Sequence, residues 1–366
     1  MKQYRTIPLL LFCLCLLLFP ACASKEEKEI RKEVEKELDG LKETKPETIQ
    51  DYLDTEGLFS EFTQEDASSA LDIGEIFTLF YQNFSYEIKK VTAEETHAEA
   101  KVKITTLDMQ DVAKDYMTQS LKKRITLDAT PSSVDFSLND SYLLLEDLLR
   151  TNEYETSDTT AVIQLEKDQE QWKILHTREL DDALTGNFRQ YMMDSSLLSP
   201  SEIVEIHFQT IKDFDSEQLK IYLSLDQLLD TDTEYNRAIA HAVAEQISRV
   251  FDYEVLSEEI QGKEATVQIS ITSVNPQSTL ADYSDSLSAW LKTSESLAVG
   301  EDGRREKERE LLLAAIENST DTTTRKIKIH LENDGVNWKI QMDSEIAQAV
   351  FGDIQTAMED VSEDVE

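Results

Sequence analysis

A long internal repeat limits what this chain can fold into. Residues 84–116, FSYEIKKVTAEETHAEAKVKITTLDMQDVAKDY, align without a gap on residues 251–283, FDYEVLSEEIQGKEATVQISITSVNPQSTLADY, and nine of the 33 positions are identical. A second block, WKILHTRELDDALTG at 172–186, returns as WKIQMDSEIAQAVFG at 338–352. The period of about 167 residues is too long for a solenoid and matches a whole domain. The sequence therefore predicts two tandem domains.

The segments between and around the repeats set the predicted boundaries. Residues 199–202, Ser-Pro-Ser-Glu, form a capping box with proline at the first helical position, so a new helix should start there. We predict a first domain over 45–194 and a second over 199–358. The charged tract 22–44 has apolar residues four apart and is predicted to be a solvated helical stalk. The acidic tail 359–366 is expected to fray.

The hydrophobic pattern inside each copy switches between strand and helix periods. In copy one, residues 84–88 and 98–104 alternate apolar with polar side chains, and so do 161–165 and 172–174. Such alternation is typical of half-buried antiparallel strands. Apolar residues at helical spacing lie before the first pair of strands and between the two pairs. The predicted fold class is α+β, with helices packed on a curved antiparallel sheet, and the last helix of copy one should stop at Gly186.

The first residues have the pattern of a secretory signal. Lys2 and Arg5 precede an apolar run of thirteen residues, 7–19. That run is shorter than the roughly 20 residues needed to span a bilayer, and it fits the hydrophobic region of a signal peptide. We predict a signal peptide over 1–21.

The end of the signal segment points to a lipid anchor. Ala21-Cys22 resembles the lipobox of bacterial lipoproteins, in which the cysteine is diacylated and becomes the mature N-terminus. Cys13 and Cys15 lie inside the predicted signal peptide, so the mature chain has no second thiol with which to build a disulfide. We predict palmitate-type lipidation at Cys22 and a place on the outer, extracytoplasmic face of the cell membrane. Cleavage after Ala23, with release of the chain, is the alternative.

The charge of the chain excludes one class of partner. The formal net charge is −38, and removal of residues 1–21 takes away two basic residues and no acidic ones, which gives −40. A surface this negative repels the phosphate backbone, and no basic patch offsets it. Nucleic-acid binding is therefore not expected.

The repeated motifs carry a family resemblance. Helices on a curved antiparallel sheet resemble the cystatin-like cone of the nuclear-transport-factor-two-like superfamily. The lipobox, the FSYE/FDYE and ITTLD/ITSVN segments and the closing Trp-Lys-Ile…Ala-x-x-Gly are similar to those of tandem-domain lipoproteins of Gram-positive bacteria. The resemblance implies two cone domains, each with one concave pocket. That superfamily includes isomerases, dehydratases and non-catalytic binding modules, so the resemblance predicts a fold rather than a reaction.

A few polar and aromatic residues are candidates for a binding or catalytic site. None of the histidines in one copy aligns with a histidine in the other, and His176 is the best single candidate for a general base or a ligand contact. The predicted ligand-binding residues are Tyr86, Asp115, Tyr116, Trp172, His176, Tyr253, Asp282, Tyr283, Trp290 and Trp338. Each has a competing structural interpretation, since a lone histidine or an aromatic stripe on a sheet is more often part of a core. The sequence contains no motif for a metal or a cofactor, and we assign no catalytic residue.

These features favour a membrane-anchored, non-catalytic lipoprotein that binds a small ligand or a cell-envelope partner through one or both domains. Two alternatives remain open. One is a cone-pocket enzyme, isomerase-like or hydrolase-like, that acts from one copy around His176 with Asp115 or Tyr116. The other is a structural or adhesive surface spacer in which the duplication only adds length.

Overall fold

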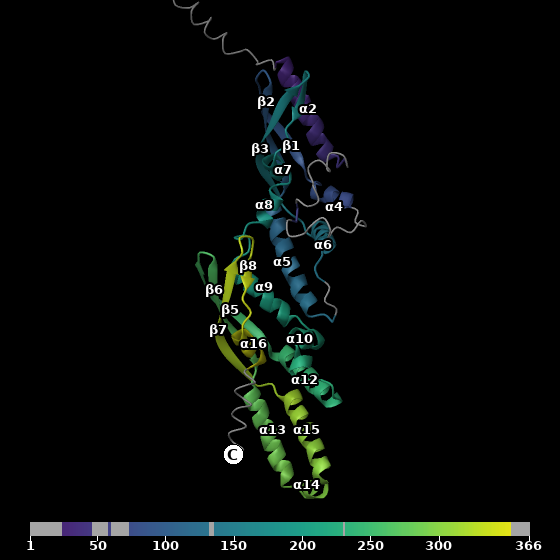
Figure 1. Ribbon diagram of the computed structural model, residues 1–366, viewed down its shortest axis with the longest axis vertical. Coiled ribbons are helices and arrows are strands. Elements are labelled where there is room, and N and C mark those ends of the chain that lie inside the picture. Colours follow the sequence, from purple (N-terminus) through teal and green to yellow (C-terminus); the bar gives the residue numbers. More distant parts are fainter. Residues whose placement is uncertain (1–23, 46–57, 60–72, 132–134, 230, 353–366) are drawn as a thin grey trace, which may run out of the picture. The chain divides into compact units, whose positions relative to one another are not determined.

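The computed structural model describes residues 24–45, 58–59, 73–131, 135–229 and 231–352. In these residues the chain is α+β, with two four-stranded antiparallel sheets and helices against each of them (Figure 1). The predicted signal peptide, Cys22 and the acidic tail lie outside the described residues. No described helix is both long enough and apolar enough to cross a membrane.

The first sheet has the order β1-β2-β3-β4. Its strands are β1 (Ser85–Ala93), β2 (His97–Leu107), β3 (Thr156–Asp168) and β4 (Gln171–Ile174). The helices of this part of the chain are α2 (Lys25–Lys42), α4 (Ile73–Phe80), α5 (Met109–Asp128), α6 (Leu138–Thr151), α7 (Arg178–Leu184) and α8 (Phe188–Met192).

The second sheet has the matching order β5-β6-β7-β8. Its strands are β5 (Asp252–Gln261), β6 (Glu264–Val274), β7 (Thr322–Asn333) and β8 (Trp338–Ile340). The helices that follow the junction are α9 (Pro200–Lys212), α10 (Ser216–Tyr222), α11 (Leu225–Leu228), α12 (Glu234–Val250), α13 (Pro276–Leu291), α14 (Ser294–Ala298), α15 (Gly300–Asn318) and α16 (Ser344–Phe351).

The sequence repeat is reproduced in the strand pairing. Ser85 pairs with Thr105 in the first sheet and Asp252 with Thr272 in the second, at the offset of 167 in both strands. The register shifts once in each of these pairs of strands, after Ile88 in β1 and after the aligned residue Val255 in β5. A bulge at the same position of two sheets is a designed feature of a fold rather than an accident. The predicted alternation of buried and exposed residues is also present in both β2 and β6.

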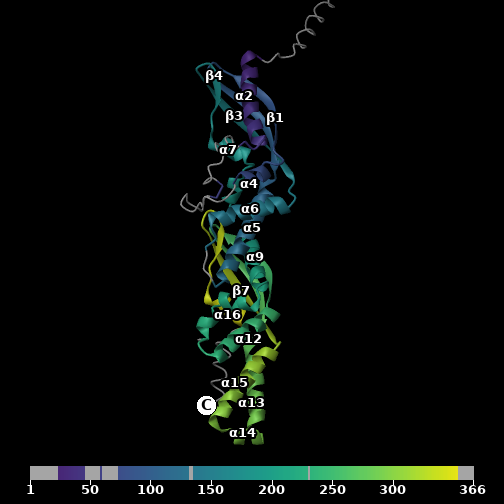
Figure 2. The ribbon, with the colours of Figure 1, turned by 90° about the vertical axis from the view of Figure 1, so that its right-hand side faces the viewer.

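The interpretation of residues 22–44 as a solvated stalk is corrected by the structure. The tract does form a helix, α2, and its apolar residues do share one face. That face is fully buried, because Ile30, Val34 and Leu38 have no exposed surface and α2 contacts β1, β2 and β4 (Figure 2). A narrow apolar stripe on a charged helix suits a covering helix as well as a stalk. The structure shows that it covers the first sheet.

Helix α9 has the same relation to the second sheet as α2 has to the first. Ser199 and Glu202 form the predicted capping box, with the Glu202 backbone N–H donating to Ser199 Oγ at 3.2 Å and the Ser199 N–H donating to Glu202 Oε2 at 2.8 Å. Ser24 and Glu27 form a capping box at the start of α2. The repeated unit therefore includes a leading helix, although the sequences of α2 and α9 no longer align.

The chain divides into two compact units, and each unit is made of three separate segments rather than of one continuous copy. The first unit comprises Met1–Gln64, Ser68–Val112 and Leu149–Arg189, and the second comprises Glu65–Ala67, Ala113–Leu148 and Gln190–Glu366. Most of α5 thus belongs to the second unit, where Ile125 and Ala129 join the apolar core around β6 and β7. The boundaries predicted at 45–194 and 199–358 remain predictions about the copies in the sequence.

Candidate functional site in the second unit

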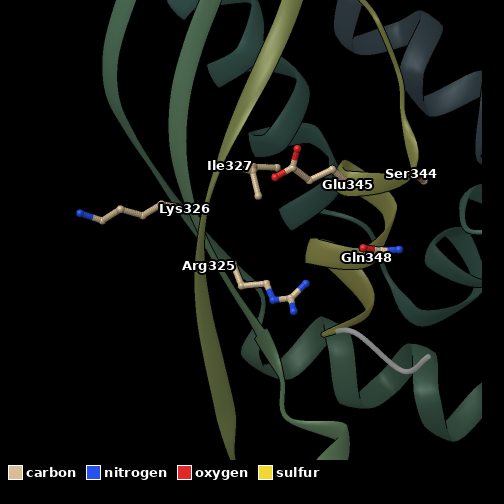
Figure 3. Close-up of a pocket in the computed structure, with 6 residues that line it drawn as sticks. All are labelled: Arg325, Lys326, Ile327, Ser344, Glu345 and Gln348. Carbon is tan, nitrogen blue, oxygen red and sulfur yellow. The ribbon is translucent and has the colours of Figure 1, made fainter. Parts of the chain in front are cut away.

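An open hollow of about 500 Å³ lies in the second unit between β7 and α16. It is lined by Arg325, Lys326, Ile327, Ser344, Glu345 and Gln348. Figure 3 shows the Arg325 side chain directed toward the space between the strand and the helix, whereas the Lys326 side chain points to the other side of the strand. Ile327 is buried and the three lining residues of α16 are exposed. The hollow therefore has an apolar spot within a polar rim.

The hollow exists because the last strand of the sheet is short. Strand β8 has only three residues and pairs only with Leu331–Asn333 at one end of the twelve-residue β7. The chain then turns at once into α16, since the Asp343 carboxylate accepts a hydrogen bond from the Ile346 N–H at 3.0 Å and caps the helix. Among the described residues, the rest of β7 has no fourth strand along this edge, and α16 packs across the face of β6 and β7.

The wall that α16 provides is fixed to the sheet at its C-terminal end. Gly352 ends the helix at φ 73°, and a Cβ atom there would lie 2.0 Å from the Val274 carbonyl oxygen. The Ser273 hydroxyl also donates to the Val350 carbonyl. Only glycine permits both the left-handed backbone and this close approach. The repeated phrase thus fastens the closing helix of the second unit to its sheet.

Copy one has a different arrangement at the aligned position. Asp182 of α7 corresponds to Gln348, and it is only 6 % exposed. The Arg189 guanidinium contacts the Asp182 carboxylate at 2.6 Å. Its neighbour Asp181 has its carboxyl pKa raised, chiefly by burial. A buried ion pair thus occupies the place that the exposed Gln348 has in copy two.

The two predicted tryptophans of the repeated phrase are core residues. Trp172 and Trp338 are 6 % and 7 % exposed. Trp338 packs in the apolar cluster of the second unit, and the Lys167 ammonium lies 5.6 Å from the centre of the Trp172 ring. Trp290, at the end of α13, is likewise buried at 7 % exposure. None of the three lines the hollow.

The predicted tyrosines at the start of each sheet bind a helix. Tyr86 donates its hydroxyl to Asp39 of α2 at 2.8 Å, and Tyr253 donates to the Glu205 carbonyl of α9 at 3.2 Å. Burial and the Asp39 interaction raise the pKa of Tyr86, and burial raises the pKa of Tyr253 to about 12. Both hydroxyls are protonated at neutral pH, as tyrosine hydroxyls ordinarily are, and can act as donors. Their role in the structure is to hold the leading helix on the sheet.

The repeated Asp-Tyr pair occupies unlike environments in the two copies. Tyr116 of α5 is buried at 1 % exposure and Asp115 is half-buried, both in the second unit. Tyr283 of α13 is half-buried and Asp282 is exposed. The environment of the pair is not preserved, as the environment of a duplicated active site would be.

His176 is exposed and follows β4 in the first unit. It therefore belongs to a different unit from Asp115 and Tyr116, and the structure brings the three residues together in neither unit. Among the described residues, no group of histidine, cysteine and acidic side chains is arranged to hold a metal ion.

The residues of the hollow were not predicted from the sequence. One signal could have found them. Asp343 caps a helix only five residues after Trp338, which limits the last strand to about three residues. The preceding strand, β7, has twelve residues. A long strand beside a very short one must leave part of its edge uncovered.

Comparison with known proteins adds little to this geometry. No protein-family model and no curated protein matches the sequence. One solved structure that matches is described as a "putative lipoprotein (ycdA)" from Bacillus subtilis subsp. subtilis str. 168. It has 10 % sequence identity and a TM-score of 0.27, and the match covers 72 % of this chain and 95 % of that chain. A TM-score of that size does not establish a shared fold, and the nuclear-transport-factor-two-like resemblance stays a prediction.

Proposed function

We propose that this chain is a non-catalytic lipoprotein, anchored at Cys22 on the outer face of the cell membrane, whose second unit binds a protein partner of the cell envelope. The hollow between β7 and α16 carries the binding part of the proposal. It is open, its rim is polar, and it lies beside a strand whose edge no other described strand covers. Small-molecule sites are typically concave and mostly apolar, whereas polar rims around an apolar spot are typical of protein interfaces.

The packing of the aromatic residues also favours a protein partner over an enclosed small ligand. The tryptophans predicted to line a pocket fill the core instead. The tyrosines Tyr86 and Tyr253 are engaged with helices. A ligand could reach the tryptophans only by displacing packed core, which costs several kcal/mol for each large residue.

The anchoring part of the proposal rests on the sequence and on where the fold begins. Helix α2 is capped at Ser24, two residues after Cys22. A lipid on Cys22 would therefore join the folded chain through almost no linker. We expect Cys22→Ser to move the protein from the membrane fraction to the soluble fraction and to abolish labelling by a palmitate analogue. Retention of the label in this variant would contradict lipidation at Cys22.

The binding proposal is tested by photocrosslinking on intact cells. A photoreactive phenylalanine analogue is placed at Glu345, on the exposed side of α16, and at the aligned position Glu179 of α7 as the matched control. We expect a discrete protein adduct from position 345 and none of the same mass from position 179. Absence of any adduct from position 345, together with no adduct from a probe at Gln348, would refute a protein partner at this hollow.

A further inference from the structure

The uncovered edge of β7 suggests how the partner binds. Among the described residues, β7 has β6 on one side along its whole length, but β8 covers only its last three residues. The stretch 322–329 therefore has no strand on its other side. An open edge presents a row of N–H and C=O groups that can pair with another chain.

The direction of these groups follows from the pairing that is present. The His330 carbonyl accepts a hydrogen bond from the Gln341 N–H at 2.8 Å, so the backbone of His330 faces the side of β8. The backbone N–H and C=O groups of successive residues point to alternate sides of a strand. Those of Lys328, Lys326 and Thr324 therefore point to the same side as those of His330, where β8 has ended. The backbone N–H and C=O groups of Arg325 and Ile327 point toward β6 and are paired within the sheet.

We propose that an extended segment of the partner adds to this edge of β7 as a further strand, in line with β8 where β8 has ended. This inference rests on the proposed function and specifies its mode of binding. In strand addition the main-chain hydrogen bonds supply affinity, and pockets for alternate side chains supply specificity. The hollow of about 500 Å³ lies where the inward side chains of such a strand would enter, beside Ile327, Glu345 and Gln348.

The charges on the edge select the partner. The side chains of Lys326 and Lys328 are exposed on the outer face of the sheet, and Figure 3 shows Lys326 directed away from α16. Like charges directly opposite each other in a sheet are destabilising, so edge-to-edge pairing of two copies, which would bring these lysines together, is disfavoured. Acidic side chains at the outward positions of the added strand would pair with the lysines. We therefore infer a partner segment with acidic residues at alternate positions.

Copy one offers a matched comparison. Its β3 also extends beyond the short β4, but the residues aligned with Lys326 and Lys328 are Thr160 and Val162. Lys101 and Lys103 lie on the neighbouring strand β2, and Lys103 is paired with Asp158 at 2.8 Å. Within the described part of the chain, the first sheet thus has an open edge that lacks lysines at the two aligned positions, and Val162 is the natural control position.

The experiment uses the mature chain with Cys22→Ser and a phage-displayed library of random octapeptides. We expect panning to enrich peptides with acidic residues at alternate positions. The best peptide, made synthetically, should slow the amide hydrogen exchange of Thr324, Lys326 and Lys328. The amides of Arg325 and Ile327, already bonded to β6, should change little.

Two substitutions at one position separate backbone pairing from charge. Lys328→Pro removes an N–H that faces the open edge and leaves the ladder with β6 intact, whereas Lys328→Ala keeps the N–H and removes the charge. We expect the proline variant to bind the peptide at least about tenfold more weakly than the alanine variant, the equivalent of one hydrogen bond. Val162→Pro should bind like the unsubstituted chain, and circular dichroism should confirm that all variants fold.

The possible outcomes distinguish this inference from the proposed function. Panning without enrichment, a peptide that leaves the three edge amides unprotected, or equal binding by Lys328→Pro and Lys328→Ala would each overturn strand addition. If the crosslink from position 345 in cells then persists in the Lys328→Pro background, the protein-binding function stands and only its proposed mode is refuted.

Discussion

At the scale of single residues, the turn between β3 and β4 has left-handed backbone at two residues that are not glycine. Gln169 and Glu170 both have positive φ angles, 47° and 70°. The corresponding turn of the second sheet contains Gly335 at φ 101°. Two-residue hairpin turns with left-handed backbone strongly prefer Asn-Gly, because other residues cost of order 1 kcal/mol each in that region.

This difference leads to a prediction about stability. The double substitution Gln169→Asn with Glu170→Gly should raise the free energy of unfolding by about 1 kcal/mol, because it relieves left-handed strain without removing a buried contact. The change should appear as a higher midpoint in urea. As the converse control, Gly335→Ala should lower the midpoint. A double variant no more stable than the parent would show that the turn is unstrained.

The burial of His207 leads us to predict that the stability of the fold depends on pH. It is 9 % exposed, its Nε2 lies 3.1 Å from the Tyr222 hydroxyl, and burial lowers its pKa to about 4. The pKa of an unfolded histidine is about 6.5. As pH falls from 6.5 to 4, the unfolded state therefore binds the proton first. The stability due to neutral His207 is present above pH 6.5 and is lost through this window.

The measurement compares unfolding at pH 7 and pH 4.5 in parent and variant. His207→Gln should remove about 2 to 3 kcal/mol of the pH-dependent loss, since it keeps a polar side chain near Tyr222 but cannot titrate in this range. His330→Gln, at an exposed position, is the matched control for the replacement of a histidine by glutamine. Equal pH dependence in His207→Gln and the parent would mean that His207 is hydrated in the folded state.

At the scale of elements, the strands were more predictable than the helices around them. The alternation at 84–88, 98–104 and 161–165 predicted strands on the correct faces, because burial of one sheet face fixes the period of two. The capping box at 199–202 and the glycine stops were also predictable, since they depend on local backbone needs. The place of α2 was not predictable, because three apolar residues on one face do not reveal what they pack against.

The corrected place of α2 leads to a prediction that a stalk would fail. Leu38 is fully buried against the first sheet. Leu38→Ala should destabilise the chain by about 2 to 5 kcal/mol through loss of apolar contact and creation of a cavity. Lys36→Ala, on the exposed side of the same helix, should change stability by less than about 0.5 kcal/mol. If both variants unfold at the urea concentration of the parent, α2 does not contribute to the core.

The hollow could not be predicted for a related reason. Sequence periodicity shows which residues face the core, but the free edge of β7 depends on the length of its neighbour in space. Arg325, Glu345 and Gln348 come from a strand and a helix that meet only after β8 has ended. The aromatic and Asp-Tyr candidates stood out in the sequence because most are repeated, and among them the tryptophans and Tyr116 are core residues in the structure.

At the scale of the whole molecule, the proposed lipid on Cys22 constrains how the first unit meets the membrane. Only Ala23 separates Cys22 from the helix cap Ser24. Near the start of α2, the Lys167 ammonium contacts the Glu26 carboxylate at 3.1 Å, so the turn between β3 and β4 lies beside the end that the proposed lipid would anchor. The opposite end of β3 begins next to Glu155, about 40 Å away along a strand of thirteen residues.

The resulting orientation can be measured by fluorescence quenching. Single cysteines introduced at Gln169 and at Glu155, both exposed, are labelled on lipidated protein in vesicles that contain a headgroup-attached quencher. Because lipidation consumes the thiol of Cys22, each label is unique in the mature chain. We expect strong quenching at position 169 and little at 155, since quenching requires a separation far shorter than the length of β3. Equal quenching at the two positions would mean that the first unit lies flat on the bilayer or that the anchor does not hold its α2 end there. The same two labels on the Cys22→Ser chain, measured without vesicles, provide the unquenched reference.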